Sequence, residues 1–153
     1  METLKSIILK KPTFFIIATL LYLLVTYLLK WRLTFVPGGL IYAIGGIAGM
    51  YFLDAAEAFF KLSPSPFRSI IFSIGFSAVS FFVVTSSGSF LAAGLVLTTY
   101  MTLIFWQIGE WKLTGNNTSW YRMIAGLASH KTQQWILFSF VLVFLVQTFL
   151  FVR

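Results

Sequence analysis

Long apolar runs, separated by short polar or basic stretches, follow one another along the whole chain. A helix that crosses a bilayer needs about 20 apolar residues, and about 17 to 25 are tolerated. The segments that meet this requirement are residues 13–29, 39–60, 69–85, 90–108 and 135–152. The pattern therefore predicts an all-α fold, a polytopic transmembrane helical bundle of five spans, in which residues 1–153 form a single integral membrane domain.

The connections between these segments carry different turn signals. The sequence Ser-Ser-Gly-Ser at 86–89 suits a tight turn, so the third and fourth spans are expected to form an antiparallel hairpin. A Ser-Pro-Ser-Pro run at 63–66 ends the second span. The longest connection, 109–134, has an apolar stripe at helical spacing, formed by Trp120, Ile124 and Leu127. This stripe predicts a short interfacial helix in the headgroup region.

The composition excludes the common soluble classes. Apolar residues make up 59% of the chain and charged residues only 10%, with a mean hydropathy of +0.92. Soluble domains are about one quarter charged, so this chain has too little polar surface for a water-soluble globule. The chain also has no cysteine, which excludes thiol catalysis, disulfides and thiolate metal sites.

Positive charge dominates, with 11 Lys and Arg against 4 Asp and Glu. The cations are scattered in short groups between apolar runs, which is typical of membrane topology and not of nucleic acid binding. In the five-span topology, eight of them share a face with the amino terminus, and three lie opposite: Lys30, Arg32 and Arg153. The positive-inside rule then predicts an internal amino terminus, in a prokaryotic inner (cytoplasmic) membrane.

Ionisable side chains inside a span mark candidate sites, because each costs about 2.5 to 3.5 kcal/mol at the bilayer centre. Asp54 and Glu57 lie three residues apart in the second predicted span and so share one helix face. Further polar residues are expected at the same membrane side. Together they form a predicted polar cluster toward the cytoplasm: Asp54, Glu57, Arg68, Gln107 and Glu110.

A purely structural role for these carboxylates, as ion pairs that hold helices together, is the other interpretation and the favoured one. Glu57 and Lys61 have the i,i+4 spacing of a helical ion pair, and Asp54 has Arg68 or Lys112 as possible partners. Both carboxylates lie toward a helix C-terminus, where the helix dipole disfavours negative charge. A compensating cation is therefore expected under either interpretation.

Small residues recur at the spacing that lets transmembrane helices approach closely. The second span contains a Gly-x-x-x-Gly motif, and the third and fourth spans offer small residues four apart. We predict helix packing at these positions: Gly45, Gly49, Ser73, Ser77, Gly94 and Thr98.

The sequence contains no complete catalytic motif. It has no Gly-rich nucleotide loop, no HExxH and no GxSxG nucleophile elbow. Its one histidine, His130, stands beside Lys131 in a polar stretch and is interpreted as an exposed loop residue, not a metal ligand. We therefore predict no catalytic residue, no metal ligand and no cofactor.

The middle of the chain resembles the bacterial inner-membrane metal-dependent hydrolase family. Residues 45–57 are similar to that family's glycine-rich helix ending in Asp-x-Asp-His, and Pro66-Phe67-Arg68-Ser69 looks like its His-Arg-Ser/Thr segment. The helix from Gly94 to Gln107 resembles a later helix that bears a His and an Asp. The resemblance covers about residues 38–112.

The family's metal ligands are mostly replaced in this chain. Asp54 alone matches, and other residues stand at the remaining ligand positions: Ala56, Glu57, Phe67, Thr102 and Trp106. The resemblance therefore implies a divergent hydrolase that has lost its metal site and its activity.

The lipid bilayer is the first partner that the sequence predicts. Three functional hypotheses are compatible with such a chain. The favoured one is a non-catalytic structural or interaction subunit, bound to a membrane protein partner or to further copies of itself. The second is a small oligomeric transporter or channel that uses the carboxylates of Asp54 and Glu57. The third is the inactive, divergent metal-dependent hydrolase.

Overall fold

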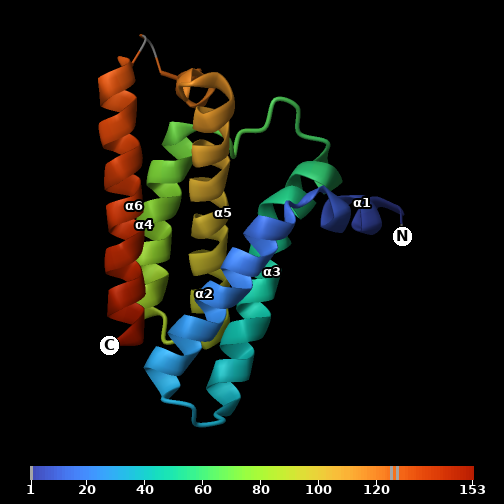
Figure 1. The fold of residues 1–153 in the computed structure, drawn as a ribbon, viewed down its shortest axis with the longest axis vertical. Helices are drawn as coiled ribbons and strands as arrows, with labels where there is room; N and C mark the ends of the chain where they lie inside the picture. The colour runs from blue at the N-terminus through green and yellow to red at the C-terminus, as the bar shows by residue number, and fades with distance from the viewer. Residues whose placement is uncertain (1, 125, 127) are drawn as a thin grey trace.

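The computed structural model describes residues 2–124, 126 and 128–153, and all regular structure in this part of the chain is helical. The helices follow in the order α1 (Glu2–Lys10), α2 (Thr13–Trp31), α3 (Pro37–Phe60), α4 (Ile70–Ser86), α5 (Phe90–Thr114), the 3-10 helix η1 (Thr118–Tyr121) and α6 (His130–Val152). Figure 1 shows α4, α5 and α6 running side by side, α2 and α3 inclined to them as a second pair, and α1 projecting sideways. The all-α prediction is confirmed.

Local capping residues fix several of the helix ends. Ser69, Ser89 and Ser129 precede α4, α5 and α6, and each hydroxyl oxygen accepts a hydrogen bond from a backbone N–H in the first turn. Such a cap contributes about 1 kcal/mol of helix stability. At the end of α5, Gly115 has a φ of 75°, a left-handed conformation that glycine adopts without strain.

The closest helix contact is between α3 and α5, and glycines make it possible. A Cβ atom at Gly45 of α3 would collide with the carbonyl oxygen of Leu91 on α5. In the reverse direction, a Cβ atom at Gly94 of α5 would collide with the carbonyl oxygen of Tyr42 on α3. Backbone atoms cannot move aside as a flexible side chain can, so both positions require glycine at this helix separation.

Threonines of α5 add hydrogen bonds across the same contact. Thr98 donates to the carbonyl oxygen of Gly46 over 2.7 Å, and Thr99 donates to that of Gly49 over 3.1 Å. The residues predicted to pack on α3 and α5 thus lie in this contact.

A buried polar network joins α4, α5 and α6 in the middle of the bundle. The hydroxyl of Tyr100 accepts a hydrogen bond from Ser77 over 2.9 Å and donates to the carbonyl oxygen of Phe140 over 2.8 Å. Ser80 donates to Oε1 of Gln147 over 2.8 Å, and the Gln147 amide donates to the carbonyl oxygen of Ser77 over 3.1 Å. Polar groups in a bilayer must be satisfied within the protein, and these are.

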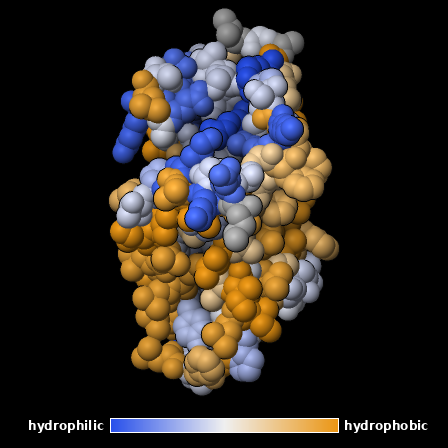
Figure 2. Space-filling model, turned by 90° about the vertical axis from the view of Figure 1, so that its right-hand side faces the viewer, coloured by the Kyte–Doolittle hydropathy of each residue, from blue (hydrophilic) through white to orange (hydrophobic). Residues whose placement is uncertain are grey.

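Helices α2, α3, α5 and α6 are each long and apolar enough to cross a membrane. Helix α4 is apolar but has 17 residues, which is roughly 25 Å at 1.5 Å per residue and thus at the lower limit for a span. Large hydrophobic side chains are exposed on all these helices, and Figure 2 shows a broad hydrophobic surface below one hydrophilic end. The fold is compatible with a multi-pass membrane protein, and the count of five spans stays a prediction.

The structure differs from expectation at two short segments. In place of an interfacial helix through Trp120 and Ile124 there is only η1, and Trp120 is buried at 1% exposure instead of facing headgroups. Leu127, the third residue of the predicted stripe, lies outside the described residues. Helix α1 was not predicted, because its nine residues are too few for a span.

Candidate functional site

A cleft of about 590 Å³ lies where the α1–α2 junction, the second half of α3 and the end of α5 meet. Figure 2 shows hydrophilic side chains gathered around a recess near one end of this face, above the hydrophobic surface. The charged residues that line the cleft come from each of these elements and from the α3–α4 connection: Lys10, Lys11, Asp54, Arg68 and Lys112.

The most deeply placed charges in the cleft are Lys11 and Asp54. Their Nζ and Oδ2 atoms are 2.9 Å apart, and the two side chains are 5% and 23% exposed. The contact is an ion pair by distance, but the ammonium does not approach Oδ2 in hydrogen-bonding geometry, so this buried oxygen has no hydrogen-bond partner in the described structure. The Lys11 ammonium also lies 4.2 Å from the ring centroid of Phe15.

Burial sets the electrostatics of Lys11, which lies just before α2 and outside the helices that could span a membrane. Removal from water lowers the pKa of this ammonium below its ordinary value, because the charged form is the one that loses hydration. The Asp54 carboxylate opposes this shift but does not cancel it. Lys11 therefore depends on Asp54 for its charge compensation.

A second ion pair lies beside the first. Nε of Arg68 is 3.3 Å from Oε1 of Glu57, and the guanidinium carbon is 4.1 Å from the ring centroid of Trp106 on α5. The Arg68 side chain is 45% exposed, so water screens this pair. A smaller hollow of about 270 Å³ adjoins the cleft, with Lys10, Asp54, Glu57 and Arg68 among the residues that line it.

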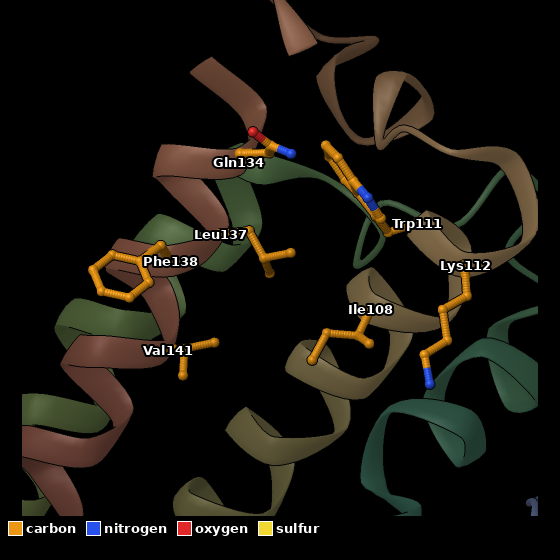
Figure 3. A pocket seen from close by; sticks show the side chains of 7 residues that line it. All are labelled: Ile108, Trp111, Lys112, Gln134, Leu137, Phe138 and Val141. Carbon is orange, nitrogen blue, oxygen red and sulfur yellow. The ribbon is translucent and has the colours of Figure 1, made fainter. Parts of the chain in front are cut away.

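Two lysines of the cleft have no such partner. The ion pairs in the described part of the chain are those of Lys11 and Arg68, and neither Lys10 nor Lys112 joins one. Figure 3 shows the Lys112 side chain turned toward α3 and away from the other labelled residues. Four cations thus face two carboxylates around the cleft and its smaller neighbour, which leaves an excess of positive charge.

The base and sides of the cleft are apolar. Phe14 and Phe15 of α2 meet Phe105 of α5, with ring centroids 6.1 Å and 5.0 Å apart. Trp106 and Ile108 of α5 complete this lining. The cleft therefore combines two parts. We call its four cations the cationic rim, and its three phenylalanines the aromatic base: Lys10, Lys11, Arg68 and Lys112, and Phe14, Phe15 and Phe105.

The structure brings together three of the residues predicted to form a polar cluster and separates the others. Asp54, Glu57 and Arg68 line the cleft or its neighbour, with Arg68 rather than Lys61 as the partner of Glu57. Gln107 is buried and donates to Oγ of Ser73 over 3.3 Å.

Glu110 instead anchors η1, accepting hydrogen bonds from the Ser119 hydroxyl and, over 2.7 Å, from Nε1 of Trp120. Sequence reasoning did not place Lys10 and Lys11 in the cluster. Their position directly before a predicted span is the signal in the sequence that marks them as candidates for this end of the helices.

A different groove, of about 410 Å³, runs between α5 and α6. Figure 3 shows Ile108 on one side of it and Leu137, Phe138 and Val141 on the other, and Lys112 points away from them. Its lining is mainly apolar, with Gln134 and Lys112 as the polar members and no carboxylate, so it offers less chemistry than the cleft.

Metal-binding geometry is absent from the part of the chain that the structure describes. No group of three or more His, Asp or Glu side chains lies close enough to hold a metal ion there. His130 is exposed, as expected, but it is the first residue of α6 and not a loop residue; its Nε2 lies 3.0 Å from the carbonyl oxygen of Gly115 and its ring beside Trp111.

Known proteins give no further guide to the cleft. No protein-family model matches the chain, and no curated protein or solved structure does so either. The residues of the cleft and the exposed helix faces are thus the basis for assigning a function.

Proposed function

We propose that the protein is an integral membrane protein of five spans that acts as a non-catalytic interaction subunit, binding another transmembrane helix along α4. The observation that carries this proposal is that one face of α4 is exposed, because no other helix of the described chain packs over it. At 17 residues it is short for a bilayer, and association with a further helix is one way to accommodate such a mismatch.

The exposed face of α4 suits a close helix contact. A Cβ atom built at Gly75 would meet no other atom within 4 Å, so the backbone is open at this position. Ala78 is exposed next to it, and Ile71 and Ile74 are exposed on the preceding turn. Small residues flanked by large apolar ones are typical of transmembrane helix interfaces.

The closed interior of the bundle favours a subunit over a single-chain transporter. Tyr100 is fully buried, its ring centroid is 4.3 Å from that of Phe140, and its hydroxyl is fully engaged. A solute path through the middle of the bundle would have to displace this packing and leave polar groups without partners.

We infer the orientation from the distribution of cations. With each of the five helices α2 to α6 taken as one crossing, the helix order places eight cations on the side of the amino terminus and the other three opposite; the eight are Lys5, Lys10, Lys11, Lys61, Arg68, Lys112, Arg122 and Lys131. By the positive-inside rule, the richer end and the amino terminus face the cytoplasm of a prokaryotic cell.

A site-specific crosslink tests the proposal, because the chain has no native cysteine. Ala78→Cys on α4 and, as control, Leu21→Cys on the exposed face of α2 are labelled with a maleimide–benzophenone in native membranes and irradiated. We expect a protein adduct at Ala78→Cys that is lost when Gly75→Leu is added. The adduct mass distinguishes a second copy from another protein.

Equal adducts at both labelled positions, or lipid adducts alone, would contradict the proposal. Saturable solute uptake by proteoliposomes that contain the isolated chain as a monomer would also contradict it, since that is a transporter's activity.

A further inference from the structure

We propose that the cleft between α2 and α5 binds the phosphate headgroup of an anionic membrane lipid, with its acyl chain against the aromatic base. This inference goes beyond the proposed function and does not depend on it. The protein could bind a partner helix along α4 without binding this lipid, and it could bind the lipid without a partner helix.

Charge is the first argument for the proposal. Lys11 and Arg68 have carboxylate partners, whereas Lys10 of α1 and Lys112 of α5 have none in the described structure. Both unpaired lysines line the same cleft although they come from different helices. A phosphate between them would supply the missing negative charge, and basic pockets between transmembrane helices are suited to lipid headgroups.

The aromatic base is the second argument, and it separates a lipid from a free anion. Phe15 packs edge-on against Phe105 below the lysines, with 5.0 Å between ring centroids. Phe14 lines the cleft yet is 73% exposed, so the cleft opens onto the lipid-facing surface of α2. An acyl chain fits this apolar side, whereas inorganic phosphate would leave it uncovered.

The level of the cleft relative to the helices is the third argument. Lys11 precedes α2, and Lys112 lies in the last turn of α5, so the cationic rim is at the ends of the spanning helices. Helix α1 projects sideways from the start of α2 in Figure 1 and exposes Leu4, Ile8 and Leu9. Apolar residues on a short helix in this position suit the boundary between headgroups and acyl chains.

A lipid titration of the purified full chain in a neutral detergent tests the proposal. Native mass spectrometry counts bound phosphatidylglycerol, with phosphatidylcholine as the neutral lipid and inorganic phosphate as the chain-free competitor. The test variant is Lys10→Gln with Lys112→Gln. The matched control is Lys61→Gln with Lys131→Gln, which removes the same charge from two exposed lysines that do not line the cleft.

We expect one tightly bound phosphatidylglycerol per chain, with affinity reduced about tenfold or more in the cleft variant and by less than about twofold in the control. Lys10→Arg with Lys112→Arg should retain the lipid, because the charge is kept. Circular dichroism and gel filtration establish that each variant is folded; if the double Gln variant is not, Lys112→Gln alone replaces it.

Three results would overturn the proposal. Equal weakening in the cleft and control variants would show general charge attraction, and equal binding of phosphatidylcholine would show no headgroup recognition. Displacement of the lipid by inorganic phosphate at a comparable concentration would indicate a free-anion site. Because this measurement uses the isolated chain, its failure is distinguishable from failure of the α4 crosslink in native membranes.

Discussion

Lys11, in front of α2, and Asp54, inside α3, form an ion pair with 2.9 Å between Nζ and Oδ2. The lysine side chain is only 5% exposed, so the pair connects two helices through a charge that has little access to water. The neighbouring Glu57–Arg68 pair is more open, because Arg68 is 45% exposed. Two adjacent ion pairs therefore differ in how much the fold depends on them.

Asp54→Asn should lower the free energy of unfolding by about 3 kcal/mol, because it leaves a buried ammonium without its counter-charge. Glu57→Gln, the control, should cost less than about 1 kcal/mol, since water screens Arg68. Replacing both partners, as in Lys11→Met with Asp54→Leu, should recover most of the loss. Unfolding in mixed micelles measures all three, and equal losses for both carboxylate variants would refute this assignment.

The lowered pKa of Lys11 predicts a pH dependence with a definite sign. Between its folded pKa and the ordinary value of 10.5, the unfolded chain binds more protons at this site than the folded one. The contribution of Lys11 to the free energy of unfolding should therefore rise with pH in that window, as the cost of burying a charge is relieved. The difference between wild type and Lys11→Met, measured from pH 8 to 10.5, isolates this contribution; a flat or falling difference would be inconsistent with it.

Alanine substitutions should have opposite effects on stability at a glycine in the α3–α5 contact and at a glycine outside it. Gly94→Ala should lower the free energy of unfolding by about 2 kcal/mol, since its Cβ meets the backbone of Tyr42. On the same helix, a Cβ at Gly109 meets nothing within 4 Å, so Gly109→Ala should stabilise by about 0.5 to 1 kcal/mol. Thermal unfolding of the two variants tests this, and the same sign for both would count against the contact.

Removal of the buried Tyr100 hydroxyl should lower the free energy of unfolding. Tyr100→Phe removes the hydrogen bonds to Ser77 and Phe140, and we expect a loss of about 1 to 2 kcal/mol in unfolding free energy. Tyr27→Phe is the matched control, because its exposed hydroxyl donates to the carbonyl oxygen of Thr34. Hydrogen exchange of the α6 backbone near Phe140 should increase in the first variant only.

The lengths of the apolar runs, and the Gly, Pro and Ser residues between them, were enough to place the long helices. The predicted 39–60 and 90–108 correspond to Pro37–Phe60 and Phe90–Thr114, and the second continues until Gly115 adopts a left-handed conformation. The sixth helix begins at His130, before the apolar run, because Ser129 caps a polar first turn. Run length and capping residues act within one segment of the chain, so they can be recognised from the sequence.

The charged site was decided by the tertiary structure. The sequence brought Asp54 and Glu57 onto one helix face, because three-residue spacing does so on any helix. It did not identify Lys11 as the partner of Asp54, because that contact depends on how α2 lies against α3. Run lengths and helical periodicity are properties of one segment, whereas distances between charges on different helices follow from crossing geometry and depth of packing. The sequence by itself therefore determined the helices and their apolar character, and only their arrangement in space created a cationic cleft.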